Sequence, residues 1–269
     1  YTIESRHLGL VTADEISDIT DKIRFLGGLS EKNILLDKII NFSDRTFPSF
    51  SEPCIKKISD IKPVVAVARD RAFCFLYQEN ISLLEKTGCC VKYFSPLYDR
   101  CVPEDADGLI ICGGYPELYA EQLSDNVSML ESVKNLIDGG IPLIAECGGF
   151  MYLHKYIKDG GKIHRMAGVF EDSVYRTDRL QRFGYITLDS KNDSLLFRKD
   201  EKITAHEFHY WDSTDCGKSL TAIKSDGRSW ECCKCSEKMY AGFPHIYFYS
   251  DIRIAERFAK ACAEYGGRK

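Results

Sequence analysis

The spacing of hydrophobic residues along this chain changes near Pro63. Upstream of it, apolar residues stand three or four apart after a capping box formed by Thr12 and Glu15, which predicts an amphipathic helix. We expect this helix to stop at Gly27-Gly28 and a second amphipathic segment to begin at Ser30. The pattern therefore predicts a short helical segment over residues 1–45.

Residues 46–62 interrupt this pattern, because Pro48, Pro53 and several serines are typical of a linker. Beyond Pro63, short apolar runs alternate with helical patterns. The expected strands cover 64–68, 89–94, 109–112 and 142–145, and the expected helices cover 75–87 and 124–138. This alternation predicts an α/β fold, a mostly parallel sheet with helices on both faces. Further strands are expected over 185–188, 203–210 and 239–242, before a closing helix over 250–264.

Composition narrows the class of protein. The chain has 269 residues, 44% of them hydrophobic, which is enough for a sizeable core. A net charge of −4 gives no electrostatic footprint for nucleic acid or an anionic membrane surface. Uninterrupted apolar runs fall far short of the ~18 residues that a membrane helix needs. The 12 scattered cysteines suit a reducing cytoplasm better than a disulfide scaffold.

A cysteine stands where one predicted strand meets a helix. Cys147 follows the apolar run 141–144 and is followed at once by Gly148 and Gly149. Glycines permit a tight turn that presents the sulfur, and the start of a helix favours a thiolate. These features are typical of a nucleophile elbow. A buried structural cysteine on a tight turn is the alternative.

Five sequence blocks in a fixed order carry a family resemblance. They are 65–75, 94–97, 113–118, 145–153 (AECGGFMYL) and 206–210 (HEFHY). The chain from about Lys62 resembles the C-terminal half of the cobyrinate a,c-diamide synthase family, a class I glutamine amidotransferase domain of the cobyrinate/cobyrate synthase branch. Residues 5–11 resemble the tail of that family's ATP-dependent synthetase domain.

The resemblance implies a division of the chain into three parts. Residues 1–45 would be a C-terminal remnant of the synthetase domain, 46–62 a linker and 63–269 the glutamine amidotransferase domain. The chain starts at Tyr1 with a polar, charged segment that has no signal-peptide pattern, and we interpret it as a fragment of a longer protein.

The resemblance also implies a partner for Cys147. His245, after a β-like run and just before the closing helix, stands where the family has its catalytic histidine. The wider amidotransferase class places a glutamate two residues further on, but here that residue is Tyr247. The cobyrinate/cobyrate synthase branch that this chain resembles also lacks this glutamate. A Cys–His dyad is therefore expected, and what orients His245 is left open.

A glycine pair supplies the remaining part of the expected site. Gly113 and Gly114 follow a predicted buried strand, and we assign them to oxyanion and substrate binding together with Tyr115 and the N–H of Gly148. From the spacing alone, Gly113-Gly114 is equally compatible with an ordinary tight turn. The family match selects the functional interpretation.

Two other clusters resemble metal sites at first sight. His206 and His209 are three apart in a β context, so they would face opposite sides of a strand and not share a metal. The resemblance places this block near a domain junction or the corrinoid acceptor. Cys232, Cys233 and Cys235 lack the two ligand pairs that structural zinc requires, and no metal site is expected.

A nucleotide site is not expected in this chain. Gly217-Lys218-Ser219 lacks the upstream glycine of a Walker loop, because position 212 is Asp. No cofactor is therefore expected here, while ATP and Mg²⁺ would act in the full-length family enzyme.

Together with the Cys147 turn, the resemblance thus implies a glutaminase that forms a cysteine thioester and supplies ammonia for amidation of the corrinoid a and c carboxylates in cobalamin biosynthesis. Glutamine and, through the synthetase domain, the corrinoid are the expected partners; a homodimer is left open. Two alternatives remain: a paralogue that amidates another tetrapyrrole, such as hydrogenobyrinate or nickel sirohydrochlorin, and a non-catalytic amidotransferase-like module that binds a partner synthetase.

Overall fold

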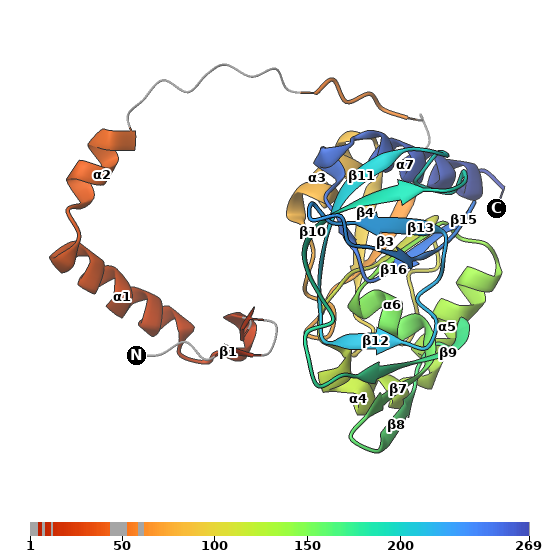
Figure 1. Cartoon of the computed structure of the whole chain (residues 1–269), viewed down its shortest axis with the longest axis horizontal. Helices are drawn as coiled ribbons and strands as arrows, with labels where there is room; N and C mark the ends of the chain where they lie inside the picture. Colours follow the sequence, from red (N-terminus) through yellow and green to blue (C-terminus); the bar gives the residue numbers. More distant parts are fainter. Residues whose placement is uncertain (1–4, 7–8, 12, 44–52, 59–61, 269) are drawn as a thin grey trace. The chain divides into compact units, whose positions relative to one another are not determined.

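The computed structural model describes residues 5–6, 9–11, 13–43, 53–58 and 62–268. Packing divides the chain into two compact units, residues 1–54 and 55–269. Figure 1 labels many of the elements of both units. The expected capping residue Thr12 and much of the expected linker lie outside the described residues.

The first unit is built from short helices. A two-stranded ribbon, β1 (Ser5–Arg6) and β2 (Gly9–Leu10), precedes the 3₁₀ turn η1 (Ala13–Glu15), α1 (Ile19–Asn33) and α2 (Leu36–Ser43). The predicted stop at Gly27-Gly28 is wrong, because α1 continues through both glycines and ends at Asn33. A glycine inside a helix costs only about 1 kcal/mol relative to alanine, so it weakens the helix without ending it.

A six-stranded sheet forms the centre of the second unit. Its order is β15-β16-β6-β5-β3-β4, parallel throughout except that β15 runs antiparallel to β16. The strands are β3 (Val64–Ala68), β4 (Cys90–Phe94), β5 (Gly108–Ile111), β6 (Leu143–Glu146), β15 (Lys234–Ser236) and β16 (Met239–Gly242). The predicted α/β class with a mostly parallel sheet is confirmed.

Helices cover both faces of this sheet, as expected. They are α3 (Gln78–Lys86), α4 (Ala120–Asp125), α5 (Val127–Asp138), α6 (Gly148–Leu153) and α7 (Arg253–Gly266), with 3₁₀ turns η2 (Pro116–Tyr119) and η3 (Phe248–Ser250). Helix α3 starts three residues later than predicted. Phe75 is held extended instead, because its N–H donates to Gly113 O at 3.0 Å.

Alternation along the strands separates two cores. In β3, Ala66 and Ala68 pack into the core that contains residues of α5 and α6, whereas Val65 and Val67 pack into the core of α3 and α7. Helices α3 and α7 are in contact with each other on that second face (Figure 1). A sheet buried on both sides explains the continuous apolar strands of the sequence.

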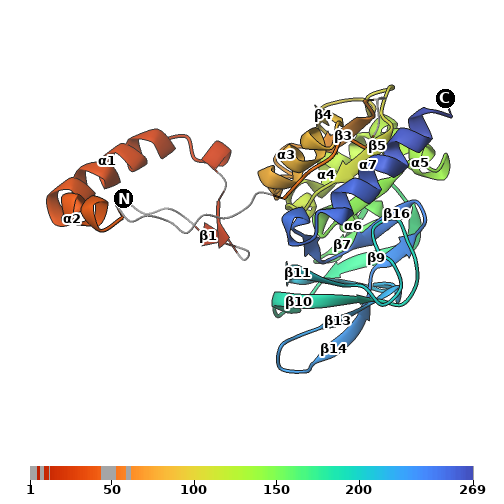
Figure 2. The same ribbon diagram turned by 90° about the horizontal axis from the view of Figure 1, so that it is seen from above.

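The second half of this unit is richer in β structure than predicted. Figure 2 shows β10, β11, β13 and β14 grouped together. They belong to a five-stranded antiparallel sheet of order β14-β13-β10-β11-β17, made of β10 (Arg182–Ser190), β11 (Lys202–His209), β13 (Leu220–Ile223), β14 (Ser229–Cys232) and β17 (His245–Ile246).

A further sheet of order β12-β9-β7-β8 was not predicted. It contains β7 (His154–Asp159), β8 (Lys162–Arg165), β9 (Phe170–Arg176) and β12 (Trp211–Ser213). Its strands carry many exposed polar residues, so the sequence shows no apolar run there. Among the described helices, none has the length and apolar character to cross a membrane.

Candidate active site

Cys147 lies at the sharp turn between β6 and α6. Its φ of 48° and ψ of −104° are unusual for a residue with a side chain, and such backbone costs on the order of 1–3 kcal/mol. The turn is held from both sides, because Cys147 N donates to Gly242 O at 2.8 Å and Met151 N donates to Cys147 O at 2.9 Å. The strained turn presents the sulfur, as in a nucleophile elbow.

His245 begins β17 and lies beside this turn. Its buried imidazole, 9% exposed, lies close enough to the Cys147 side chain for that side chain to raise the pKa of the histidine. The two residues are brought together because β16, which leads into β17, pairs in parallel with β6. The expected pair is thus in contact, and its catalytic role stays a prediction.

A carboxylate that the sequence analysis missed contacts the same imidazole. Glu146, the last residue of β6, is 6% exposed and places Oε2 3.4 Å from His245 Nδ1. Its Oε1 accepts a hydrogen bond from Ile246 N at 3.0 Å. The only sequence signal was an acidic residue inside an apolar strand, directly before Cys147. The pairing of Gly242 with Glu146, which brings this carboxylate to β17, is not readable from local pattern.

The surroundings of His245 favour its charged form. Burial opposes protonation, but the neighbouring side chains of Cys147 and Glu146 outweigh it and raise the pKa of His245 to about 10. An imidazolium beside a sulfur favours the thiolate, which is the nucleophilic form of cysteine. The arrangement therefore places a charged imidazole beside the sulfur of Cys147.

A buried asparagine fixes the segment that carries His245. Asn80 in α3 donates through Nδ2 to Ile246 O at 2.8 Å and accepts at Oδ1 from Phe248 N at 2.8 Å. Both bonds are buried, so neither backbone group is available to water. Asn80 therefore holds both residues that flank Tyr247 and keeps β17 in place.

The predicted glycine loop lies directly against the imidazole. A Cβ on Gly113 would come 2.5 Å from His245 Cε1, and a Cβ on Gly148 would come 2.9 Å from Gly114 N. Glycine is required at both positions because of this close approach. The backbone of Gly114 and Gly148 thus converges next to Cys147, and its part in oxyanion binding stays a prediction.

Two tyrosines near the site have partners within the protein. Tyr115 is buried, its N–H donates to Ala72 O at 2.9 Å and its ring packs edge-on against Phe75. That N–H group therefore already has a partner in Ala72 O. A substrate contact for Tyr115 stays a prediction. Tyr247 is 39% exposed, and its ring packs against Tyr77. Its side chain is therefore not positioned to hydrogen-bond His245.

His206 and His209 point to opposite sides of β11, as their spacing predicts. His206 pairs with His245 across β11 and β17 and packs against Tyr185. His209 is buried, stacks on Phe243 with ring centroids 4.0 Å apart and bonds Trp211 O through Nδ1 at 2.6 Å. Contacts of either residue with a domain junction or an acceptor stay predictions.

The cysteine cluster is part of the core. Cys232 and Cys233 are buried, and burial raises the pKa of the Cys233 thiol well above its usual range. Within the described ranges, no group of three or more metal-ligating side chains comes together.

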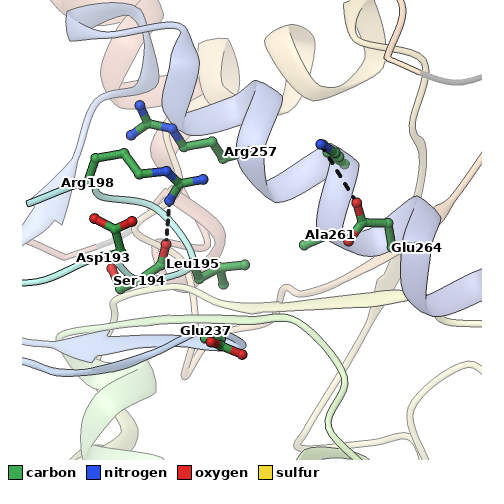
Figure 3. Close-up of a pocket in the computed structure, with 9 residues that line it drawn as sticks. Asp193, Ser194, Leu195, Arg198, Glu237, Arg257, Ala261 and Glu264 are labelled. Atoms are coloured by element: carbon green, nitrogen blue, oxygen red, sulfur yellow. Dashed lines mark hydrogen bonds and ion pairs between the residues drawn. The ribbon is translucent and has the colours of Figure 1, made fainter.

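A cavity of about 380 Å³ lies elsewhere, between α7 and the 193–198 loop (Figure 3). Its basic side chains have partners within the protein. Arg198 donates to Ser194 O at 2.8 Å, and Arg257 forms ion pairs with Glu201. Lys260 lies 3.9 Å from Glu264. This cavity does not contain the Cys147 site.

Comparison with known proteins assigns the family. A model of the CobB/CobQ-like glutamine amidotransferase domain matches residues 64–252. The chain belongs to this family. The match covers both Cys147 and His245, together with most of the second unit.

Relatives of this CobB/CobQ-like domain extend the similarity to the first unit. Cobyrinate a,c-diamide synthase of Fusobacterium nucleatum is 41% identical over 270 residues, covering 94% of this chain and 59% of the relative. The enzyme of the same name from Caldanaerobacter subterraneus is 38% identical, covering 98% of this chain and 59% of the relative. The chain therefore spans about three fifths of the length of these relatives.

Solved structures agree with the fold of the CobB/CobQ-like domain. PurLQS from Thermotoga maritima matches with a TM-score of 0.51 at 16% identity, covering 76% of this chain and 99% of that chain. A glutamine amidotransferase structure matches with a TM-score of 0.52 at 19% identity, covering 74% of this chain and 98% of that chain. At this identity the likeness shows the fold alone, and it confirms the predicted class I glutamine amidotransferase architecture.

Proposed function

We propose that this chain hydrolyses glutamine to glutamate and ammonia through a thioester on Cys147. The observation that carries the proposal is the buried imidazole of His245, which lies beside the Cys147 side chain at a strained strand–helix turn. Membership in a glutamine amidotransferase domain family supports glutamine as the substrate.

Each step of the reaction has a group to perform it. The sulfur of Cys147 attacks the carboxamide carbon, while the N–H groups of Gly114 and Gly148 stabilise the oxyanion. The carbon–nitrogen bond then breaks as His245 gives its proton to the leaving ammonia, and a thioester remains. Water next attacks the thioester, and His245 accepts its proton. The carbon–sulfur bond breaks, glutamate leaves and the thiolate is restored.

We further propose that the ammonia serves amidation of the corrinoid a and c carboxylates, as the name of the relatives indicates for those enzymes. That step would use ATP and Mg²⁺ bound outside the second unit. Gly217, in the one Gly-Lys-Ser sequence, donates its N–H to Asp215 Oδ1 at 2.9 Å, so these residues do not fit a phosphate-binding loop.

The substitution Cys147→Ser tests the proposal. We expect it to abolish ammonia release from glutamine, because a serine hydroxyl is a far weaker nucleophile than a thiolate at pH 7. Cys90→Ser is the matched control, since Cys90 is exposed on β4 and should leave the rate unchanged. Ammonia release at the parental rate by Cys147→Ser would refute the proposal. Trapping the thioester by mass spectrometry would add direct support.

A further inference from the structure

The position that normally orients the catalytic histidine of this class is occupied by Tyr247, which is 39% exposed and packs against Tyr77. We propose that Glu146 takes over this task and acts as the positioning residue for His245. The inference rests on the proposed function, because orientation of an imidazole matters for reactivity only if that imidazole serves Cys147.

The geometry gives the two oxygens of Glu146 separate tasks. Oε1 accepts from Ile246 N at 3.0 Å, so the strand that carries His245 itself holds the carboxylate. Oε2 then lies 3.4 Å from His245 Nδ1. This separation is long for a hydrogen bond, but such bonds are often long before substrate binds and tighten in the reacting complex.

The contact decides where the protons of His245 lie. A carboxylate can only accept, so Nδ1 must carry a proton, which leaves Nε2 for the sulfur of Cys147. This arrangement is the tautomer that a base needs, and the carboxylate also stabilises the imidazolium formed during turnover.

The other titratable groups that surround Glu146 and His245 do not compete for this role. They are Tyr77 before α3, Cys112 after β5, His206 on β11 and Tyr240 on β16. Burial raises the pKa values of Tyr77, Cys112 and Tyr240, and it lowers that of His206, so all four are neutral near pH 7. Within the described part of the chain, Glu146 is the one carboxylate in ion-pair range of His245.

The substitution Glu146→Gln separates a positioning role from a structural one. The glutamine carbonyl can still accept from Ile246 N, so the strand contact is kept. Its NH₂ group then faces Nδ1 in place of Oε2 and can only donate. A donor at this point favours the neutral tautomer with the proton on Nε2 and disfavours the imidazolium.

Three measurements on the 269-residue chain test the positioning role of Glu146. We expect Glu146→Gln to lower kcat/KM for glutamine by ~10²-fold or more, the usual scale for lost proton transfer. The rate of Cys147 alkylation by iodoacetamide near pH 7 should fall with it. In ¹⁵N NMR of the histidines, the Nδ1 proton of His245 should be present in the parent and absent in the variant.

Glu207→Gln is the matched control, because Glu207 is also a buried carboxylate, 2% exposed, and its Oε2 has no partner among the described residues. It should leave all three measurements unchanged. A Glu146→Gln chain that keeps the Nδ1 proton and the parental alkylation profile would overturn the inference. That result would leave the proposed function standing if ammonia release still depends on Cys147, whereas release independent of Cys147 would remove the function itself.

Discussion

Acid should destabilise the fold through one buried histidine, His154, at the end of α6. Its ring is fully buried, with Nδ1 2.8 Å from Phe150 O and Nε2 2.7 Å from Ser213 Oγ. The carbonyl of Phe150 can only accept, so Nδ1 carries the proton, and neutral Nε2 accepts from the Ser213 hydroxyl, whose oxygen also lies 3.1 Å from Asp215 O. Burial outweighs the hydrogen bond to Phe150 and lowers the pKa of His154 to about 4.

The sign and size of the effect follow from linkage. The unfolded chain takes up a proton at His154 near the ordinary histidine pKa of 6.5, while the folded chain resists protonation until about pH 4. Stability is therefore lost as the pH falls from 6.5 toward 4. The shift corresponds to about 2 kcal/mol of lost stability between pH 7.5 and pH 5.

His245 contributes in the opposite direction. Its pKa is raised, so the stability it provides is fully present below 6.5 and is lost as the pH rises through about 10. The effect of His154 must therefore be isolated with the variant His154→Gln, which keeps a donor or acceptor near Ser213 but cannot take up a proton. The difference in unfolding free energy between parent and variant cancels the contribution of His245.

Guanidinium unfolding at pH 7.5 and pH 5, followed by the fluorescence of buried Trp211, measures this difference. We expect the parent to lose about 2 kcal/mol relative to His154→Gln on going to pH 5. His164→Gln, on the β8 hairpin, controls for loss of a histidine as such. An identical pH dependence of parent and His154→Gln would refute the reasoning.

Two further predictions concern the site. His245→Ala should lower the glutaminase rate by ~10²-fold or more and slow alkylation of Cys147 near neutral pH, and an unchanged alkylation profile would remove His245 from the site. Asn80→Ala should destabilise the chain by about 3 kcal/mol in denaturant unfolding, because Ile246 O and Phe248 N would both be left buried without their partner. Parental stability of that variant would show that the β17 segment is held by other contacts.

The sequence predicted those parts of the fold that depend on local pattern. The buried strands β3, β5 and β6 appear as apolar runs because both faces of the sheet are covered, and the turn at Cys147 is marked by Gly148 and Gly149. Helix α1 shows the limit of the same reasoning. Whether α1 continues through Gly27-Gly28 depends on small differences in helix propensity. A rule that ends a helix at every glycine pair ignores these differences.

The candidate site was predicted in part for a related reason. Cys147 could be assigned from local sequence, because its neighbours build the turn. His245 could be assigned only from the family resemblance. The contact of Glu146 with His245 arises from the register of β6 with β16, a pairing between segments far apart in the chain. Local spacing carries no information on such a register, so this carboxylate could not be assigned beforehand.

The pairing of β6 with β16 also ties reactivity to the order of synthesis. Cys147 leaves the ribosome long before His245, and Ile246 lies 100 residues beyond the carboxylate that it binds. A nascent chain that stops short of β16 lacks the imidazole and the Gly242 carbonyl that holds the turn. On the proposed mechanism its sulfur is inert toward glutamine, so incomplete translation products do not consume the cell's glutamine or release ammonia that nothing captures.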